Sequence, residues 1–214
     1  MSQFDTQSER DFYDFCSRQG WTATKLHEAT EPGVRTPDFL VRTQTDYEFV
    51  AEVTEFESEE PLIPGEIRVR GHILGNPLRA KLNGKKTQVK TSSKHFPTLI
   101  VVCGGSEHSA KLEPISFDAA LYGEMAITVF VPHDPRRAPT FDDEMHNAGR
   151  RFFGATHNTS VSAVAALDLH PQRLRIYHNK FAKLPLDTSR TKIGTSSVEH
   201  YTKGEGTASG WIPA

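Results

Sequence analysis

Hydrophobic and polar positions alternate along the chain with two different periods, which predicts a mixture of helices and strands. Over residues 8–19, Phe12, Phe15 and Cys16 form the apolar stripe of an amphipathic helix. The stretch "EFVAEVTEF" over 48–56 alternates with the period of two that is typical of a strand. The same reasoning predicts strands over 21–28, 37–42, 98–105, 125–131, 161–169 and 174–179, and helices over 76–94, 117–122 and 141–153.

The order of these elements predicts the fold class. One helix, three strands, a second helix and a fourth strand, followed by further elements, favour an α/β protein with a mixed central sheet flanked by helices. Asn76 is expected to cap the second helix, with Pro77 in its first turn. Residues 1–187 form the expected domain. Residues 188–214 are polar and rich in Ser, Thr and Gly, so we expect a loosely ordered C-terminal tail.

Composition places the chain among ordinary soluble globular proteins, with 36% hydrophobic and 24% charged residues. No apolar run reaches the roughly 18 residues that a membrane span needs, and the first residues do not resemble a signal peptide. Cys16 and Cys103 do not form a disulfide framework or a Cys-x-x-Cys motif. We therefore expect a cytoplasmic protein that does not act at a membrane.

Charge is distributed unevenly along the chain, although the net charge is only −2. Residues 46–60 contain seven acidic residues and no Lys or Arg, whereas residues 79–94 contain six basic residues and no acid. The net charge argues against a globally basic nucleic-acid binder. The two runs are compatible with two solvated faces, or with a cation site beside a basic strip that faces phosphates.

Two carboxylates are the strongest candidates for chemistry. Glu52 shares a strand face with Val50, and a buried carboxylate costs several kcal/mol unless it is paired or holds a metal. Asp38 begins the preceding strand, and a hairpin through residues 43–46 would bring it beside Glu52. Two such carboxylates form a hard-oxygen site suited to Mg²⁺ or Mn²⁺, as phosphodiester hydrolysis requires.

Pro37-Asp38 followed by Glu52-Val53-Thr54 resembles the PD-(D/E)XK nuclease superfamily, which has the restriction-endonuclease-like fold. The resemblance implies an αβββαβ core over roughly residues 8–104 and a divalent-metal-dependent nuclease that acts on DNA. It further implies that Asp38, Glu52 and the carbonyl of Val53 bind the metal. Glu9 matches a first-helix Glu that completes the metal shell through water. Many nucleases of this fold dimerise, so the resemblance also allows a homodimer.

The sequence departs from this family at Thr54, where a Lys is expected. In some members the lysine lies on the following helix instead. Leu78, Leu82, Lys85 and Val89 cluster on one face of that helix, so Lys85 would point toward the sheet. We therefore expect Lys85 to supply the missing charge, with Lys81 as the second candidate and Lys86 as the third. Gln88 is expected to position a water or a phosphate.

Two alternatives remain open at this stage. Thr54 is compatible with a member of the same fold that has lost catalysis and acts as a nucleic-acid-binding or assembly module. The chain is also compatible with an unrelated α/β interaction domain. The first alternative predicts no lysine ammonium close to the Asp38 and Glu52 carboxylates, and the second predicts that these two carboxylates do not meet.

Overall fold

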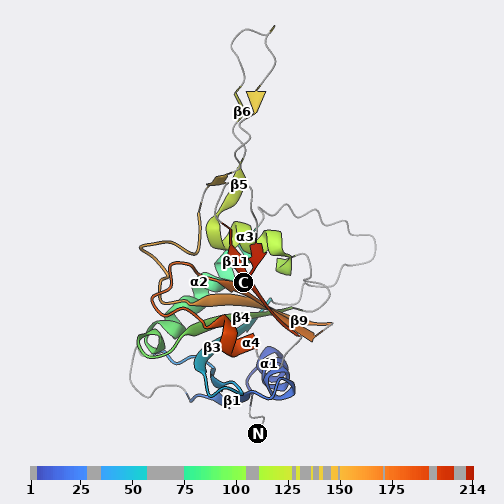
Figure 1. The fold of residues 1–214 in the computed structure, drawn as a ribbon, viewed down its shortest axis with the longest axis vertical. Coiled ribbons are helices and arrows are strands. Elements are labelled where there is room, and N and C mark those ends of the chain that lie inside the picture. Colours follow the sequence, from blue (N-terminus) through green and yellow to red (C-terminus); the bar gives the residue numbers. More distant parts are fainter. Residues whose placement is uncertain are drawn as a thin grey trace.

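An eight-stranded mixed sheet flanked by helices forms the centre of the protein in the computed structural model (Figure 1). The structure describes residues 4–27, 35–56, 75–104, 111–126, 129–130, 136, 140–141, 146–148, 150–170, 172–192, 197–204 and 211–214. The strand order across the sheet is β1-β2-β3-β4-β9-β10-β11-β12. The α/β class and the flanked mixed sheet therefore agree with the prediction from sequence.

The elements of the N-terminal half follow the predicted order of helix, three strands, helix and strand. They are α1 (Gln7–Arg18), β1 (Thr22–Lys25), β2 (Phe39–Arg42), β3 (Glu48–Glu55), α2 (Asn76–Lys90), the 3₁₀ turn η1 (Ser92–Lys94) and β4 (Thr98–Gly104). β1, β2 and β3 pair antiparallel in succession. The chain then passes through α2, and β4 pairs parallel to β3, as a crossover connection requires.

The C-terminal half completes the sheet and covers one of its faces. Its helices are α3 (Pro114–Tyr122) and α4 (Thr188–Lys192), and its sheet strands are β9 (Ala163–Leu169), β10 (Gln172–His178), β11 (Val198–Lys203) and β12 (Trp211–Pro213). β9 runs parallel to β4 and antiparallel to β10. β11 is parallel to β10, and β12 closes this side of the sheet in an antiparallel pair.

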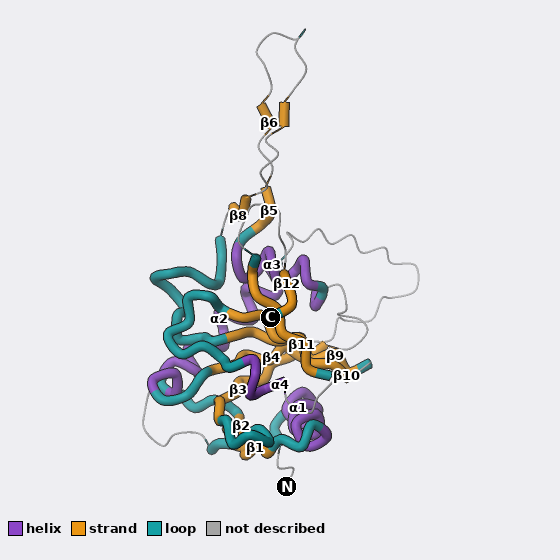
Figure 2. The backbone as a smooth tube through the Cα atoms, viewed as in Figure 1, coloured by secondary structure: helices purple, strands orange, loops and turns teal. Residues whose placement is uncertain are grey.

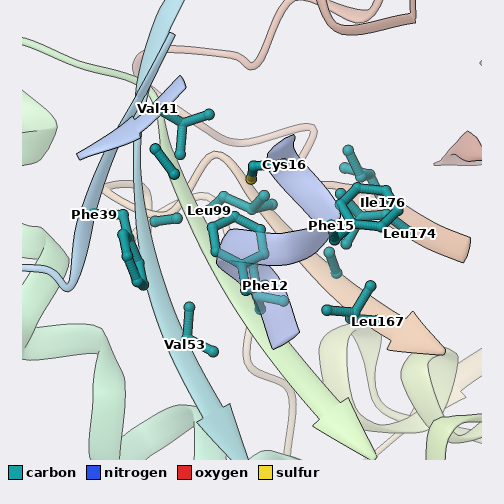
Figure 3. Close-up of a cluster of buried hydrophobic side chains, with 14 of the residues drawn as sticks. Phe12, Phe15, Cys16, Phe39, Val41, Val53, Leu99, Leu167, Leu174 and Ile176 are labelled. Atoms are coloured by element: carbon teal, nitrogen blue, oxygen red, sulfur yellow. The ribbon is translucent and has the colours of Figure 1, made fainter. Parts of the chain in front are cut away.

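Two hydrophobic cores lie on opposite faces of the sheet. The first joins α1 to the strands, and Figure 3 shows Phe12, Phe15 and Cys16 of the helix against the side chains of several strands. The second joins α2 and α3 to the other face through Leu82, Phe117 and their neighbours. Figure 2 shows the strands lying between α1 and α3. The middle of β3 is consequently buried on both faces.

The start of α2 differs in detail from the prediction. Gly75, not Asn76, occupies the N-cap position, and no side chain caps the helix there. Gly75 has φ +79°, and an added Cβ would lie 2.5 Å from the backbone nitrogen of Ala120. This close approach between α2 and α3 requires glycine. Asn76 instead accepts a hydrogen bond from Arg79 at 2.6 Å.

The strand prediction for residues 125–131 is confirmed in part, because two short strands lie there, whereas the helix prediction for residues 141–153 was wrong. β5 (Glu124–Ala126) pairs with β8 (His146–Ala148), and β6 (Val129–Phe130) pairs with β7 (Thr140–Phe141), in two small antiparallel ladders. Figure 1 shows these ladders beyond α3, away from the large sheet. The helical stripe was misleading because cross-strand pairing competes with helix formation over the same residues. Residues 152 and 153 are buried next to each other, which a helical stripe does not predict.

The expectation of a loosely ordered C-terminal tail was also wrong. Residues 188–214 contribute α4, β11 and β12, and the two strands extend the main sheet. Val198 and His200 alternate with more exposed residues, so one face of β11 is buried despite its polar sequence. Residues 57–76 begin acidic and then contain Pro and Gly, which predicts an irregular stretch, and they lie mostly outside the described residues.

A pair of histidines, half-buried His178 and buried His200, links the end of β10 to β11. His178 Nε2 lies 2.8 Å from His200 Nδ1, and the rings stack at 5.1 Å. Thr191 Oγ1 lies 3.2 Å from His200 Nε2. Burial lowers the pKa of His178 to about 4. Burial, His178 and Lys192 lower the pKa of His200 to about 3.

This pair is expected to make the fold sensitive to acid. Both pKa values are lower in the folded state than the usual 6.5, so the unfolded chain binds more protons and stability falls as pH drops below about 6.5. Between pH 7 and pH 5 the loss is on the order of 1–2 kcal/mol per histidine. The measurement is the free energy of unfolding from urea denaturation at pH 7 and pH 5. His200→Gln should make the difference between the two values smaller. His95→Gln, at an exposed position, should retain it.

Candidate active site

Glu52 lies in the middle of β3, on the sheet face that α2 covers. Its side chain is 0% exposed, and Oε2 has no hydrogen-bond partner among the described residues. The position follows from the strand pattern, because Glu52 shares its face with Val50 while Ala51 and Val53 belong to the core beneath α1. An acid in a buried strand needs a compensating charge.

Asp38 lies beside Glu52 at the open end of the β2–β3 hairpin. The register pairs Phe39 with Ala51, so the next step outward places Asp38 opposite Glu52. Asp38 Oδ2 accepts a hydrogen bond from the backbone N–H of Val53 at 2.7 Å. The peptide group of Val53 thus fixes the Asp38 carboxylate next to Glu52. The unrelated-domain alternative predicted that the two acids would not meet, and this geometry contradicts that prediction.

Lys85 of α2 provides the compensating charge. Its Nζ donates a hydrogen bond to Glu52 Oε1 at 2.7 Å, with the lysine side chain 28% exposed. Lys85 reaches Glu52 because Leu82 and Val89, on the same helix, pack against the sheet. Thr54, two residues after Glu52, is buried on the same strand. The positive charge at Glu52 therefore comes from α2, since Thr54 carries only a hydroxyl.

Glu9 and Lys25 form a second ion pair at the edge of this cluster. Lys25 Nζ lies 2.5 Å from Glu9 Oε2 and 3.9 Å from Asp38 Oδ1. The backbone N–H of Asp5 also donates to Glu9 Oε2, at 3.0 Å. Both contacts hold Glu9 on the α1 side of the sheet. Glu9 is therefore close to the two carboxylates, and Lys25 lies between Glu9 and Asp38.

The electrostatics of the cluster reflect this crowding of acids. Burial, reinforced by the charges of Asp38 and Glu9, raises the pKa of Glu52 to about 7 despite the opposing effect of Lys85. Burial also raises the pKa of Asp38, against the Val53 N–H, Lys25 and Lys85. For Lys25, burial lowers the pKa, but Glu9 and Asp38 outweigh burial and raise it. A cation placed between Asp38 and Glu52 would favour the ionised form of both carboxylates.

The donor set fits a hard divalent cation in part. Asp38 and Glu52 offer two neighbouring carboxylates, and the unpartnered Oε2 of Glu52 is a buried oxygen with coordinating capacity to spare. Within the described part of the chain, however, no group of three or more His, Cys, Asp or Glu side chains is arranged to hold a metal. Backbone oxygens and water would have to complete the shell, as Mg²⁺ usually requires.

The other predicted residues occupy different positions around the cluster. Gln88 lines a cavity of about 890 Å³ together with Asp38 and Lys25, so it borders the same open space as Asp38. Lys86 Nζ donates a hydrogen bond to Asn83 Oδ1 at 2.9 Å rather than to Glu52. Among the described residues, the ammonium that contacts Glu52 is that of Lys85, and the role predicted for Lys81 stays a prediction. For Val53, the contact with Asp38 is made by its N–H, and the predicted role of its carbonyl stays a prediction.

Lys25 is the residue that sequence reasoning missed. In "WTATK" the lysine falls on the same side of the strand as Trp21 and Ala23, both of which are buried. A cation on the apolar side of an alternating strand is a signal of a buried ionic partner. That signal was present in the sequence, although the identity of the partner was not.

Comparison of the chain with protein-family models, curated proteins and solved structures finds no match. No described helix has the length and apolar character needed to cross a membrane. The family resemblance therefore depends on the motif residues and on the arrangement of the elements that position them.

The raised pKa of Glu52 predicts that the site destabilises the fold at alkaline pH. A folded-state pKa near 7, against about 4.5 for the unfolded chain, means that stability falls as pH rises through this range. Glu52→Gln preserves the shape of the side chain and removes the charge. In the absence of divalent metal, wild type loses stability between pH 5 and pH 8 and this variant does not. The free energy of unfolding of Glu52→Gln relative to that of wild type should therefore increase by about 2–3 kcal/mol over this range.

The measurement is urea denaturation in EDTA at pH 5 and pH 8. Glu48→Gln is the matched control, because Glu48 lies on the same strand and face and pairs with Arg42 near the surface. Identical pH profiles for wild type and Glu52→Gln would contradict the electrostatic account of the site.

Proposed function

We propose that the protein is a divalent-metal-dependent nuclease that hydrolyses phosphodiester bonds, with DNA as its substrate. We further propose that residues 7–104 form a restriction-endonuclease-like core. The element order α1-β1-β2-β3-α2-β4 supports this, as does the placement of Asp38, directly before β2, opposite Glu52 of β3. The observation that carries the proposal is the 2.7 Å contact between Lys85 and Glu52.

That contact matters because Thr54 does not supply the positive charge that this type of site needs. Lys85 brings an ammonium group to the carboxylate pair from a different element, and so provides the charge by another route. A non-catalytic site would not need to keep a buried acid beside a second acid, at a cost to stability. The arrangement therefore favours an active site over the decayed alternative.

In this proposal Asp38 and Glu52 hold the cation, with the Val53 carbonyl and Glu9 as further contributors to its shell. Mg²⁺ or Mn²⁺ bound there would polarise a phosphoryl oxygen and lower the pKa of a nearby water. The Val53 N–H keeps the Asp38 carboxylate in position before substrate arrives. Preorganisation of this kind reduces the cost of reaching the reactive geometry.

Lys85 would stabilise the negative charge that develops on the phosphoryl group and orient the attacking water. Hydrolysis forms a bond from the water oxygen to phosphorus and breaks the bond from phosphorus to the leaving sugar oxygen, which takes up a proton. Gln88 is placed to hydrogen-bond the water or a phosphate, because it lines the cavity beside Asp38. Lys25 would keep Asp38 ionised by adding a nearby positive charge.

Cleavage assays test this assignment directly. Asp38→Asn and Glu52→Gln should each lower the rate of plasmid cleavage in Mg²⁺ by at least about 100-fold, because each removes a cation ligand. Lys85→Met should lower the rate by about 10²–10³-fold, the range seen when one charge-stabilising group is lost. The control is again Glu48→Gln, which should cleave at the wild-type rate. Wild-type rates for Asp38→Asn and Glu52→Gln would refute the proposed site, and a larger loss for Lys81→Met than for Lys85→Met would assign the lysine role to Lys81.

A stability measurement separates metal binding from catalysis. Mg²⁺ should raise the free energy of unfolding of the wild-type protein by about 2.7 kcal/mol at 100 times its dissociation constant, and leave Glu52→Gln nearly unchanged. Stabilisation by metal without cleavage of plasmid, single-stranded DNA or RNA would favour the alternative function, a nucleic-acid-binding module that has lost catalysis.

A further inference from the structure

A second pocket, of about 700 Å³, lies on the other side of α2 from the cavity that Gln88 lines. Its walls come from the end of α2, from η1, from the loop before β9 and from the segment after β10. Among the described residues that line it none is acidic, and four are lysines: Lys86, Lys90, Lys94 and Lys183. We call it the basic pocket.

The lysines of the basic pocket are available to a ligand. Lys90, Lys94 and Lys183 are exposed, and within the described parts of the chain none of them forms an ion pair with a carboxylate. This contrasts with Lys25, Lys85 and Lys203, each of which contacts an acid. Positive charges gathered without counter-charge create a local potential that attracts anions, and the concave shape strengthens it.

Most of the remaining lining residues carry hydroxyl groups, which can donate hydrogen bonds to phosphate oxygens. Thr87, Ser93, Thr156, Thr159 and Ser160 contribute hydroxyl groups to the wall. Hydroxyl groups and lysines together are the usual partners of a nucleic-acid backbone, whereas recognition of bases needs other geometry. The pocket therefore has the chemistry of a phosphodiester-binding surface.

The loop that forms the far wall is held in place by buried hydrogen bonds. Asn179, which is 3% exposed, donates to the carbonyl oxygens of Asn158 and Val161. Thr98 donates to the carbonyl of Ser160 at 2.6 Å, and the Lys183 N–H donates to that of Thr159 at 2.9 Å. The wall is thus prepared before a ligand binds, which lowers the entropic cost of binding.

α2 connects the basic pocket to the candidate active site. Lys85 points to Glu52, while Lys86, Thr87 and Lys90 of the same helix line the pocket. Lys85 and Lys90 are about 7.5 Å apart along the helix axis, at 1.5 Å per residue. That separation corresponds to roughly two base pairs of a DNA strand, at 3.4 Å each.

We propose that the basic pocket binds the phosphodiester backbone of a nucleic acid a few nucleotides from the bond that the active site would cleave. The proposal depends on the proposed function for its choice of partner. The pocket would supply affinity and alignment that do not depend on sequence, and the carboxylates would supply the chemistry. This division accounts for the basic run that follows the acidic run in the sequence.

The experiment measures binding without cleavage. A fluorescein-labelled 20-base-pair DNA duplex and an RNA duplex of the same length are titrated with the full chain in EDTA, and anisotropy is followed at several salt concentrations. Lys90→Glu/Lys183→Glu should raise the dissociation constant about tenfold or more and reduce the salt slope by about two, because each phosphate contact contributes about 0.9. Arg10→Glu/Arg18→Glu on α1 is the control, with the same change in net charge at exposed positions.

Loss of affinity for the pocket variant, with the control close to wild type, supports the proposal, and the duplex on which it occurs identifies DNA, RNA or both. Equal losses in the two double variants, or no loss in either, would overturn it. So would binding to phosphatidylserine vesicles that is weakened in the pocket variant while duplex binding is unchanged. Since no metal or cleavage is involved, this result is independent of whether the Asp38 and Glu52 variants lose hydrolysis.

Discussion

The register between β2 and β3 is the constraint on which the rest of the site depends. Pairing Phe39 with Ala51 sends one set of side chains to the core beneath α1 and the other set toward α2. A shift of β3 by one residue would exchange its two faces, turning Phe49 away from the core beneath α1 and moving Glu52 into it. The hydrophobic core therefore fixes the register, and the register places Asp38 opposite Glu52.

Once the register is set, the carboxylates of Asp38 and Glu52 lower the stability of the fold, and the residues around them hold them in place. Two acids lie side by side next to a parallel pair of strands, and burial raises the pKa of both. Lys85 offsets part of the cost of burial at Glu52, and the Val53 N–H offsets part of it at Asp38. The packing of Leu82 and Val89 of α2 against the sheet supplies the support, since it keeps Lys85 close whatever charge Glu52 carries. Buried charged groups that lower the stability of the fold are more typical of functional sites than of residues that serve folding alone.

The sequence predicted the N-terminal half well because local pattern and tertiary packing agree there. The stripe of α1, the alternation of β3 and the apolar run of β4 each match the face that the structure buries. Lys85 was predictable for the same reason, since it lies on the stripe of α2. Lys25 was not assigned, because its partner Glu9 comes from a separate element and the pairing depends on tertiary structure.

The C-terminal half was less predictable because its strands depend on their neighbours. β11 is polar in sequence, yet it is a strand because β10 offers an edge and His178 meets His200 across the pair. β7 and β8 lie in a stretch with helical spacing, and their pairing with β6 and β5 decides the outcome. In both cases the decisive hydrogen bonds join residues that are distant in sequence, which single-sequence periodicity does not capture.

The order of the strands has a consequence for how the chain assembles. Across the large sheet, each strand lies beside the strand of that sheet that precedes it in the sequence, from β1 to β12. During synthesis, each newly made strand therefore finds its partner already present at the growing edge, and no strand has to be inserted between two others. Asp38, Glu52 and Lys85 all precede β4, so they belong to the part that is made first. Growth of the sheet by β9 to β12 then buries the outer edge of β4 and closes the structure around a site whose side chains are already in the nascent chain.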